Sequence, residues 1–565
     1  MGRSPKNNII FVSFENEFAP LGGLAAVMRL LPKRMAQLSK DRCVTLTPFF
    51  REITKCKPKL MEAIQNTGIR FPVVYDKAVR QVEVFQHEDS NGFVTYLIDS
   101  QKFFNAPCDC GDPPGMAAPC NPYWNPAHPG QLLDDALFFC AAVPKALVAL
   151  GLNEHVVLCL QDWEAAGVAI SVQDVPGLQD TTCLLTLHNS YDCPVTPAEM
   201  KKMTSQVRPG LTMLTQAGPM LDGPICTVSK HFAHELTHEV VHRKVFAPHL
   251  QTLFKKRTIR GINNGLFSEA NLPPASLARA KTGDFTGLLQ EKASRRRAMI
   301  QKLEEYQPER AWGTLDFHQF DGPVFLFFGR DDPRQKGYDL AAAAIDRIPP
   351  GEARFIFTPI PGDEGIKGLQ FLRDLADRRK GEVKVFPFRM AQGYLELQRG
   401  ASFMVMCSFY EPFGGATEGY AVGTPVVARA TGGLVQQVVP HPGVSLNVEV
   451  SRLRDQYHQV SDDPTGFLFR EAGLSAQKTA LGWRDIVDCA YWPDGERLKQ
   501  RLAIPLFRAM VQAAEGAFHD AIDLYKSDPT GYAKMIWHGC EMLARFSWDQ
   551  AVREYQEIFS SFSTR

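Results

Sequence analysis

The sequence lacks an excess of charge of either sign. Its 565 residues include 62 lysines and arginines against 62 aspartates and glutamates, whereas a protein that binds nucleic acid or a membrane surface over its whole face is net basic. Low-complexity runs are also absent, and apolar residues make up an ordinary 45 % of the chain. We therefore expect no nucleic-acid partner, and a chain of this length is expected to form two or three domains.

A secretory or membrane-spanning segment is also missing. The opening stretch MGRSPKNNIIFVSF has no apolar signal region and leads directly into a strand-like run. An apolar stretch at residues 132–152 is interrupted by Asp134, Asp135 and Lys145, so it predicts a buried amphipathic helix rather than a membrane span. We expect a cytoplasmic protein with no membrane span.

Regular disulfide or metal-binding spacing of cysteines is absent as well. The 13 cysteines are an odd number and are scattered, which predicts free thiols in a reducing cytosol rather than a disulfide framework. Cys108, Cys110, Cys120 and His128 gather in one segment rich in proline and glycine. Zinc is conceivable there, but the spacing matches no regular zinc motif. We therefore expect an irregular surface loop and predict no metal site.

Short apolar runs alternate with helical patterns along the chain. Strands buried on both faces have this near-continuous apolar character, which predicts parallel sheets covered by helices. The runs lie at residues 8–14, 43–49, 94–99, 156–162, 183–189, 224–229, 323–330, 354–360, 383–388, 403–408 and 424–430. They form two series, so we predict an α/β protein with two doubly wound, Rossmann-like domains facing a deep cleft.

The domain boundaries follow from a polar stretch between the two series. We predict an N-terminal domain at residues 1–267, a linker region at 268–320 and a C-terminal domain at 321–540. Residues 541–565 include the amphipathic pattern FSWDQAVREYQEIFSSF, which predicts a last helix that returns to the N-terminal domain. In sheets of this type, ligands bind at the carboxyl ends of the strands.

Two cations follow the predicted strand at 323–330. Arg330 and Lys336 lie six residues apart in GRDDPRQKGYD, on a loop that leads from a strand to a helix. A bidentate guanidinium with a point-charge ammonium makes an effective clamp for a diphosphate. A solvated basic loop is the alternative interpretation.

Two glutamates and several glycines lie at other predicted strand ends. Glu411 and Glu418 flank a glycine turn in SFYEPFGGATEGYAVGTPVV, and carboxylates beside a ligand need donors such as sugar hydroxyls. Gly22 and Gly23 precede a helix, and ATGGLVQQVV contains Thr431, Gly432 and Gly433. Such turns bring main-chain N–H groups close to an anion. The set predicts a site for a nucleotide diphosphate with a sugar attached. A dehydrogenase is disfavoured, because no Gly-x-Gly-x-x-Gly follows the first strand.

This combination resembles a known family. The segments PLGGLAAVMRLLPKRMA, LQDWEAAGVAI, TLHN, ICTVSKHFAHEL, GINNGLF, FFGRDDPRQKGYDL, EPFGGATEGYAVGTPVV, ATGGLVQQVV, TGFLF and FSWDQAVREY occur in the order found in glycogen and starch synthases. The chain is therefore similar to the retaining glycosyltransferases of the GT-B fold. The resemblance implies transfer of a hexosyl unit, most readily α-glucosyl, from ADP-glucose or UDP-glucose to a glucan. No metal or other cofactor is implied.

The resemblance also implies roles for individual residues. Arg330 and Lys336 match the cations that hold the donor diphosphate, Glu411 matches the glutamate beside the transferred sugar, and Glu418 matches the ribose-binding glutamate, with a spacing one residue short. The remaining matches are with residues that line the donor site. They are Gly22 and Gly23 at the phosphates, Thr431, Gly432 and Gly433 at the sugar and distal phosphate, His188, Asn264, and either Phe388 or Arg389 at the base.

The chain departs from the family almost entirely in its N-terminal half. Pro20 replaces the lysine of Lys-x-Gly-Gly-Leu, and Gln161 and Glu164 replace both histidines of His-Asp-Trp-His. Ala26, Phe138 and Phe267 stand at other polar positions of the family. Two alternatives therefore stay open: the same donor chemistry on a small molecule, a lipid-linked glycan or a protein, and a non-catalytic scaffold that binds a sugar nucleotide. The pattern also leaves the donor base and the oligomeric state open.

Overall fold

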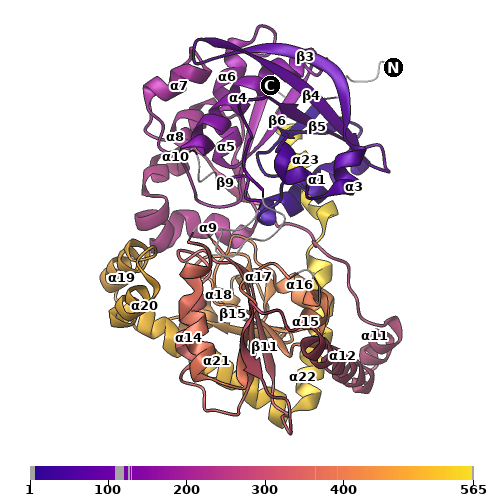
Figure 1. Cartoon of the computed structure of the whole chain (residues 1–565), viewed down its shortest axis with the longest axis vertical. Coiled ribbons are helices and arrows are strands. Elements are labelled where there is room, and N and C mark those ends of the chain that lie inside the picture. The colour runs from indigo at the N-terminus through magenta and orange to yellow at the C-terminus, as the bar shows by residue number, and fades with distance from the viewer. Residues whose placement is uncertain are drawn as a thin grey trace. The chain divides into compact units, whose positions relative to one another are not determined.

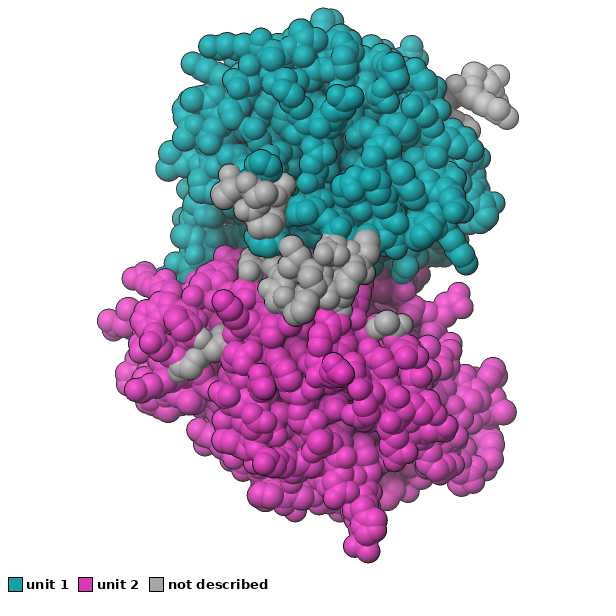
Figure 2. Space-filling view, in the orientation of Figure 1, with its two compact units in different colours: residues 1–113, 119–265, 548–565 teal, residues 114–118, 266–547 magenta. Residues whose placement is uncertain are grey.

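The computed structural model describes residues 7–108, 120–124, 128, 130–362, 364–390 and 392–562. The chain divides into two compact units (Figures 1 and 2). The first unit contains the described residues up to Gly265 together with those from Trp548 onward, and the second runs from Leu266 to Ser547.

The first unit is built on a mostly parallel sheet in the order β3-β4-β5-β2-β1-β6-β7-β8-β9. The β3–β4 and β4–β5 pairs are antiparallel, and the other neighbours in this sheet are parallel. The central strands β1 and β6 are almost wholly buried, so both faces of the sheet are covered. The strands are β1 (Asn8–Val12), β2 (Arg42–Pro48), β3 (Gln65–Tyr75), β4 (Ala78–Glu88), β5 (Val94–Asp99), β6 (Val156–Gln161), β7 (Thr182–Leu187), β8 (Ile225–Thr227) and β9 (Ile259–Gly261).

Helices of the first unit connect these strands. They are α1 (Gly23–Leu38), α2 (Arg51–Thr54), α3 (Pro58–Ala63), α4 (Gln131–Ala149), α5 (Asp162–Ala166), α6 (Val168–Ser171), α7 (Pro197–Met203), α8 (Met213–Ala217), α9 (Lys230–His238), α10 (Gln251–Lys256) and the last helix α23 (Trp548–Phe562). The predicted buried helix at residues 132–152 corresponds to α4, most of whose side chains are buried.

The helix α23 packs beside α1 within the first unit (Figure 1). Its Tyr555 hydroxyl lies 3.1 Å from Oγ1 of Thr186 at the end of β7. Its Asp549 pairs with Arg34 of α1 at 2.5 Å. The amphipathic pattern of the last segment is therefore explained by its apolar face, which is buried against this unit.

The second unit contains a seven-stranded sheet in the order β10-β13-β12-β11-β14-β15-β16. All neighbours are parallel except the edge pair β10 and β13. The strand β11 lies between β12 and β14, so the strand order reverses on either side of it, which is the position where doubly wound sheets bind ligands. The strands are β10 (Trp312–Leu315), β11 (Val324–Arg330), β12 (Arg354–Ile360), β13 (Glu382–Val385), β14 (Phe403–Met406), β15 (Val426–Arg429) and β16 (Gly466–Phe469).

Helices of the second unit cover both faces of its buried strands. They are α11 (Pro274–Lys281), α12 (Thr286–Glu305), α13 (Tyr338–Ile345), α14 (Gln370–Arg378), α15 (Tyr394–Gly400), α16 (Ala416–Ala421), α17 (Leu434–Gln437), α18 (Val448–Arg454), α19 (Ala476–Asp488), α20 (Asp494–Ala503), α21 (Pro505–Ser527) and α22 (Pro529–Met542). Residues 268–320 therefore contain two helices and a strand that belong to this unit.

The predicted α/β class with two doubly wound units is confirmed. Each sheet is dominated by parallel pairs and is flanked by helices, as the near-continuous apolar runs indicated. Within the described part of the chain, no helix is both long and apolar enough to cross a membrane.

Candidate functional site

An ion pair joins two loops at the carboxyl edge of the second sheet. Lys336 lies in the loop after β11, and its Nζ is 2.6 Å from Oε2 of Glu411, which follows β14. Ser408 Oγ donates a hydrogen bond to the same carboxylate oxygen at 2.8 Å. Gly337 has φ +61°, and a Cβ there would lie 2.3 Å from the carbonyl oxygen of Cys407. The glycine thus lets the loop of Lys336 reach the end of β14.

Arg330 supplies a second cation at this edge. It is the last residue of β11, is half-buried, and its Nη2 lies 3.7 Å from Oδ2 of the buried Asp332. Asp332 also accepts the main-chain N–H of Arg334 at 2.9 Å, which shapes the loop. Arg330 and Lys336 therefore both lie at the carboxyl end of β11, where one bound anion could contact both cations.

Glu418 lies in the first turn of α16, immediately after the glycine turn. Burial raises its pKa; the nearby Lys336 acts in the opposite direction and Glu411 adds to the rise. A Cβ at Gly415 would lie 3.8 Å from Cδ of Glu418. The two predicted glutamates, which belong to the segment from β14 to α16, are thus electrostatic neighbours of Lys336, which lies in the loop after β11.

The segment of Thr431, Gly432 and Gly433 follows β15 and is buried. The N–H of Gly433 donates to the carbonyl oxygen of Glu411 at 3.1 Å. Gly432 has φ +49°, and a Cβ there would lie 1.7 Å from the same oxygen. This glycine is required because the two loops touch through their backbones, so the segment holds Glu411 in place.

The two candidates for base contact differ in exposure. Phe388 is buried, and the guanidinium of Arg310 lies 4.7 Å from its ring centre. Arg389 is exposed. Both follow β13, on the same edge of the sheet as Arg330. Of the pair, only Arg389 has a side chain open to a ligand, while Phe388 already has a stacking partner.

Buried ion pairs that the sequence analysis missed support these loops. Arg429 and Glu471 form a two-bonded pair of 3.0 and 2.5 Å, and Arg429 Nη1 also donates to the carbonyl oxygen of Phe409 at 2.7 Å. Arg501 pairs with Asp339 at 2.6 Å and donates to the carbonyl oxygen of Pro333 at 2.7 Å. A charged residue at the end of an apolar strand, as in the TPVVARA run, is the signal that could have pointed to Arg429.

In the first unit, a buried glutamate occupies the helix start at the predicted glycine pair. Glu15 follows β1, and its Oε1 accepts the main-chain N–H groups of Leu21, Gly22 and Ala25 at 2.9, 2.6 and 3.2 Å. The carboxylate therefore takes the place that an anionic ligand has at other helix starts. Gly23 is exposed, and no atom comes within 4 Å of a Cβ built on it.

His188 and the residues after β6 form a second group in the first unit. The imidazole Nε2 of His188 lies 2.8 Å from Oε1 of Gln161, and its main-chain N–H donates to Oδ1 of Asp162 at 2.6 Å. Burial lowers the pKa of His188 to about 3, so the imidazole is neutral at physiological pH. A neutral imidazole can position a hydroxyl but carries no charge for a phosphate.

Two buried acids, Asp162 and Glu164, follow β6 in the same unit, and Glu164 stands where the family has a histidine. Burial raises the pKa of both carboxyl groups. The nearby Glu15 carboxylate raises the pKa of Asp162 further, and Asp162 raises that of Glu164. Oε2 of Glu164 is buried and has no hydrogen-bond partner among the described residues.

Phe138 stacks on Phe103 with ring centres 3.8 Å apart. Asn264 is buried after β9, and its main-chain N–H donates to the carbonyl oxygen of Val228.

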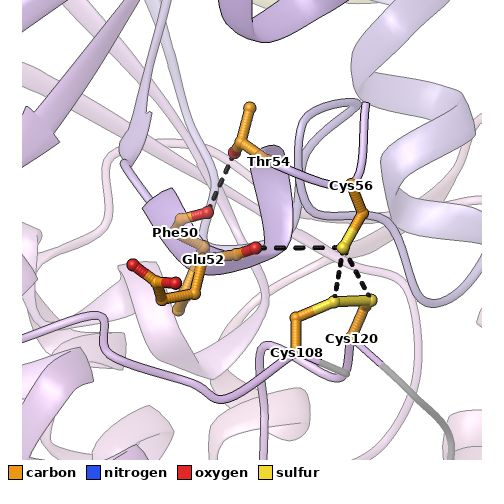
Figure 3. The surroundings of a disulfide bond; sticks show 6 residues. All are labelled: Phe50, Glu52, Thr54, Cys56, Cys108 and Cys120. Atoms are coloured by element: carbon orange, nitrogen blue, oxygen red, sulfur yellow. Dashed lines mark hydrogen bonds between the residues drawn. A yellow bond between two sulfur atoms is a disulfide. The ribbon is translucent and has the colours of Figure 1, made fainter. Parts of the chain in front are cut away.

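The expectation that the cysteines are free thiols is wrong for one part of the chain. Cys108 and Cys120, which are 12 positions apart, form a disulfide (Figure 3). The free cysteines of the described chain are Cys43, Cys140, Cys159, Cys183, Cys193, Cys226, Cys407, Cys489 and Cys540. Cys110 lies outside the described residues, and His128 is exposed.

Two segments of the chain match family models of glycosyltransferases. Residues 8–254 match the family model of the starch synthase catalytic domain, and residues 292–459 match that of family 4 glycosyltransferases in conflict systems. The chain is 24 % identical to a glycogen synthase of Moorella thermoacetica over 96 % of this chain and 94 % of the relative. It is 24 % identical to a glycogen synthase of Geotalea daltonii over 98 % of both.

A solved structure shares the fold. The catalytic domain of starch synthase IV from Arabidopsis thaliana, bound to ADP and acarbose, superposes with a TM-score of 0.68 at 17 % sequence identity. The match covers 100 % of both chains. At this identity the comparison concerns the fold, and the two doubly wound units are those of a GT-B protein.

Proposed function

We propose that this chain, a glycogen and starch synthase-like glycosyltransferase of the GT-B fold, moves an α-glucosyl unit from ADP-glucose or UDP-glucose to a glucan with retention of configuration. The domain at residues 321–540 binds the nucleotide sugar, and the domain at 1–267 receives the acceptor. The named relatives are glycogen synthases, and the starch synthase IV structure contains ADP and acarbose. Nine cysteines among the described residues are free thiols and outnumber those in the Cys108–Cys120 disulfide, which favours a reducing compartment such as the cytoplasm.

The charge requirement of the reaction explains the two cations. Cleavage of the sugar–phosphate bond places negative charge on the departing diphosphate and positive charge on the anomeric carbon. Arg330 and Lys336 follow the central strand β11, and they stabilise the leaving group most strongly when the bond breaks. The two side chains supply the charge that a divalent metal supplies in other transferases, so we propose that no cofactor is required.

Glu411 has a positioning role in this proposal. Its carboxylate is held by Lys336 and Ser408 at 2.6 and 2.8 Å, which fixes its direction beside the diphosphate clamp. It accepts hydroxyl groups of the transferred sugar, while Glu418 takes the ribose and the Thr431–Gly433 segment borders the distal phosphate. In a retaining reaction of this type, the acceptor approaches on the face of the leaving group, whose phosphate oxygen takes the acceptor's proton.

The single observation that carries the proposal is the Lys336–Glu411 pair at the carboxyl edge of the sheet. The cation and the carboxylate form an ion pair of 2.6 Å there, and the N–H of Gly433 donates to the carbonyl oxygen of Glu411 and holds its main chain. A solvated basic loop would not need this support. The pair lies next to β11, where the strand order of the sheet reverses.

A second candidate keeps the donor chemistry and changes the acceptor. The observation that favours it is Glu164, a buried carboxyl group whose Oε2 has no partner among the described residues. It stands where the family has a histidine, so a polar group on the acceptor side differs here from that of the glucan synthases. The alternative acceptors we propose are a small molecule, a lipid-linked glycan and a protein. A non-catalytic scaffold for a sugar nucleotide is the third candidate.

The test is a thermal-shift panel of ADP-, UDP- and GDP-sugars followed by transfer of the labelled sugar to glycogen. Binding to the folded state raises Tm by mass action, and Arg330→Ala should abolish the shift. Arg452→Ala is the matched control, because Arg452 is an exposed arginine of the same unit. A shift with incorporation into glycogen supports the proposal. A shift with transfer only to another acceptor supports the second candidate, and a shift without turnover supports the scaffold. No shift with any sugar nucleotide overturns all three.

A further inference from the structure

The first unit contains a pocket whose lining is strongly basic. The pocket has a volume of about 520 Å³ and is formed by residues of α9, α10 and β9 and of the short segment that joins α10 to β9 (labelled in Figure 1). None of its lining residues has a role in the proposed transfer reaction. Two histidines and two threonines line it together with four side chains that carry a full positive charge: Lys230, Lys255, Lys256 and Arg257.

Acidic side chains do not balance this charge. The described lining of the pocket includes no aspartate or glutamate, and the four cations form no ion pair within the described part of the chain, whereas Arg260 pairs with Glu557 at 2.6 Å. The whole sequence has 62 basic and 62 acidic residues, so the excess is local. A pocket of the second unit, by contrast, combines two arginines with two glutamates: Arg295, Arg399, Glu291 and Glu396. Four like charges around one pocket repel one another, and a bound anion would remove that repulsion.

The pocket also offers apolar surface beside its cations. Ala233 and Phe254 are buried and belong to its lining. Gly261 ends β9, and a Cβ there would lie 2.3 Å from the carbonyl oxygen of Ser229, so this glycine lets the strand lie against the start of α9. Arg257 is half-buried, and its Nη2 donates to the carbonyl oxygen of Pro219 at 3.3 Å, which restrains the guanidinium. The volume is within the range of roughly 300–1,000 Å³ that small-molecule sites have.

We propose that this pocket binds a small organic phosphate. The phosphate group contacts the ammonium groups of Lys230, Lys255 and Lys256 and the guanidinium of Arg257, and the organic group lies on the apolar surface of the pocket. Lysine offers a point charge and arginine a planar fork of donors, and both suit phosphate oxygens. A phosphate monoester carries about −1.5 to −2 charges at neutral pH, against −1 for a carboxylate, so it matches four cations better. Binding makes and breaks no covalent bond.

Calorimetry with phenyl phosphate as the probe tests the proposal. The full chain with Arg330→Ala and Lys336→Ala is used, so that the proposed diphosphate clamp of the other unit does not contribute. We expect one equivalent bound per chain, and benzoate, which has the same ring and a single charge, should bind more weakly. Adding Lys255→Ala and Lys256→Ala should weaken binding by about tenfold or more, as expected for the loss of a charge-assisted hydrogen bond. Adding Lys40→Ala and Lys59→Ala instead, at two exposed lysines of the same unit, should leave the affinity unchanged.

Three calorimetric outcomes would overturn the proposal. They are no binding of phenyl phosphate, equal affinity for phenyl phosphate and benzoate, and equal affinity with and without the lysines of α10. Sedimentation of the chain with phosphatidylglycerol vesicles, in the absence of phenyl phosphate binding, would assign the basic surface to a membrane instead and would also overturn it.

A second measurement uses the wild-type chain and needs no variant. Its lysines are acetylated with and without phenyl phosphate, and the modified peptides are quantified by mass spectrometry. The ligand should protect Lys230, Lys255 and Lys256, while Lys40 reacts equally under both conditions. Equal acetylation of the three, or protection of Lys336 alone, would contradict the proposal. Protection of Lys336 by a nucleoside diphosphate is read in the same way and tests the donor site, so failure of the proposed function and failure of this pocket are distinguished.

Discussion

The Nζ atom of Lys336 lies 2.6 Å from Oε2 of Glu411, so the cation expected to hold a diphosphate already has an anionic partner in the chain. A diphosphate must share Lys336 with Glu411 or displace it. This coupling links donor binding to the orientation of the carboxylate that faces the sugar. It also means that the two residues should have opposite effects on nucleotide affinity.

Removing the charge of Lys336 or of Glu411 should change diphosphate affinity in opposite directions but lower kcat in both cases. Lys336→Ala should weaken binding of the nucleoside diphosphate and lower kcat by ~10²–10³-fold, the usual loss when a group that stabilises transition-state charge is removed. Glu411→Gln should bind the diphosphate severalfold more tightly, because it removes a like charge, while its kcat also falls. Isothermal calorimetry with the diphosphate and steady-state kinetics measure the two effects. Weaker diphosphate binding by Glu411→Gln would contradict the coupling.

The contact between Gly432 and Glu411 should tolerate no side chain. Gly432→Ala places a methyl group 1.7 Å from the carbonyl oxygen of Glu411 at φ +49°, so the loop must move and activity should be lost. Gly473→Ala is the matched control, because Gly473 has φ +78° with no atom within 4 Å of the new Cβ. The control should cost only the ~1–2 kcal/mol of left-handed backbone strain and keep its kcat. Unfolding in urea and kinetics compare the two; equal activity would show that the contact is not needed.

Removing Arg429 alone from the buried Arg429–Glu471 pair should destabilise the fold more than replacing both residues with apolar ones. Burial raises the pKa of Glu471, but Arg429 and Arg470 outweigh it and hold the pKa below its usual value. Arg429→Met leaves a buried carboxylate with a poorer partner and should cost ~3 kcal/mol or more of unfolding free energy. The double variant Arg429→Met/Glu471→Leu should recover much of this loss, as urea unfolding would show. Additive losses in the double variant would contradict this account.

The loss of Arg429 should also lower kcat. Its Nη1 donates to the carbonyl oxygen of Phe409, two residues before Glu411. The double variant regains stability without this hydrogen bond, so its kcat should stay below that of the wild type. Recovery of both stability and kcat would show that the bond to Phe409 does not position Glu411.

The stability of the first unit should depend on pH through Glu164. Burial raises its pKa well above the ordinary 4.5, so above that pH the folded chain binds a proton that the unfolded chain has released. The free energy of unfolding must therefore fall as the pH rises from about 4.5 through neutrality. Glu164→Gln cannot ionise and should lose less stability between pH 5 and pH 8 than the wild type. Glu154→Gln, at an exposed glutamate, should match the wild type; equal slopes for all three would contradict the prediction.

The sequence predicted the positions of some site residues but not the contacts of others. Arg330, Lys336 and Glu411 follow apolar runs, and the carboxyl ends of parallel strands share one edge, so their positions on that edge follow from the pattern. The hydrogen bond from the Gly22 N–H to the Glu15 carboxylate could not be predicted from the pattern. It forms because a side chain seven residues earlier folds back onto a helix start. Arg429 and Arg501 were missed because their partners, Glu471 and Asp339, lie 42 and 162 residues away.

The sequence by itself determined the alternation of buried strands and helices, the division into two doubly wound units and the residues at the strand ends. These features depend on local periodicity and on the short reach of a strand-to-helix loop, which neighbouring residues encode. Only the tertiary structure decided which side chains touch: Lys336 with Glu411, Gly432 with the backbone of Glu411, and Cys56 with Cys108. Such contacts join segments that are distant along the chain, and packing of the whole unit sets their distances.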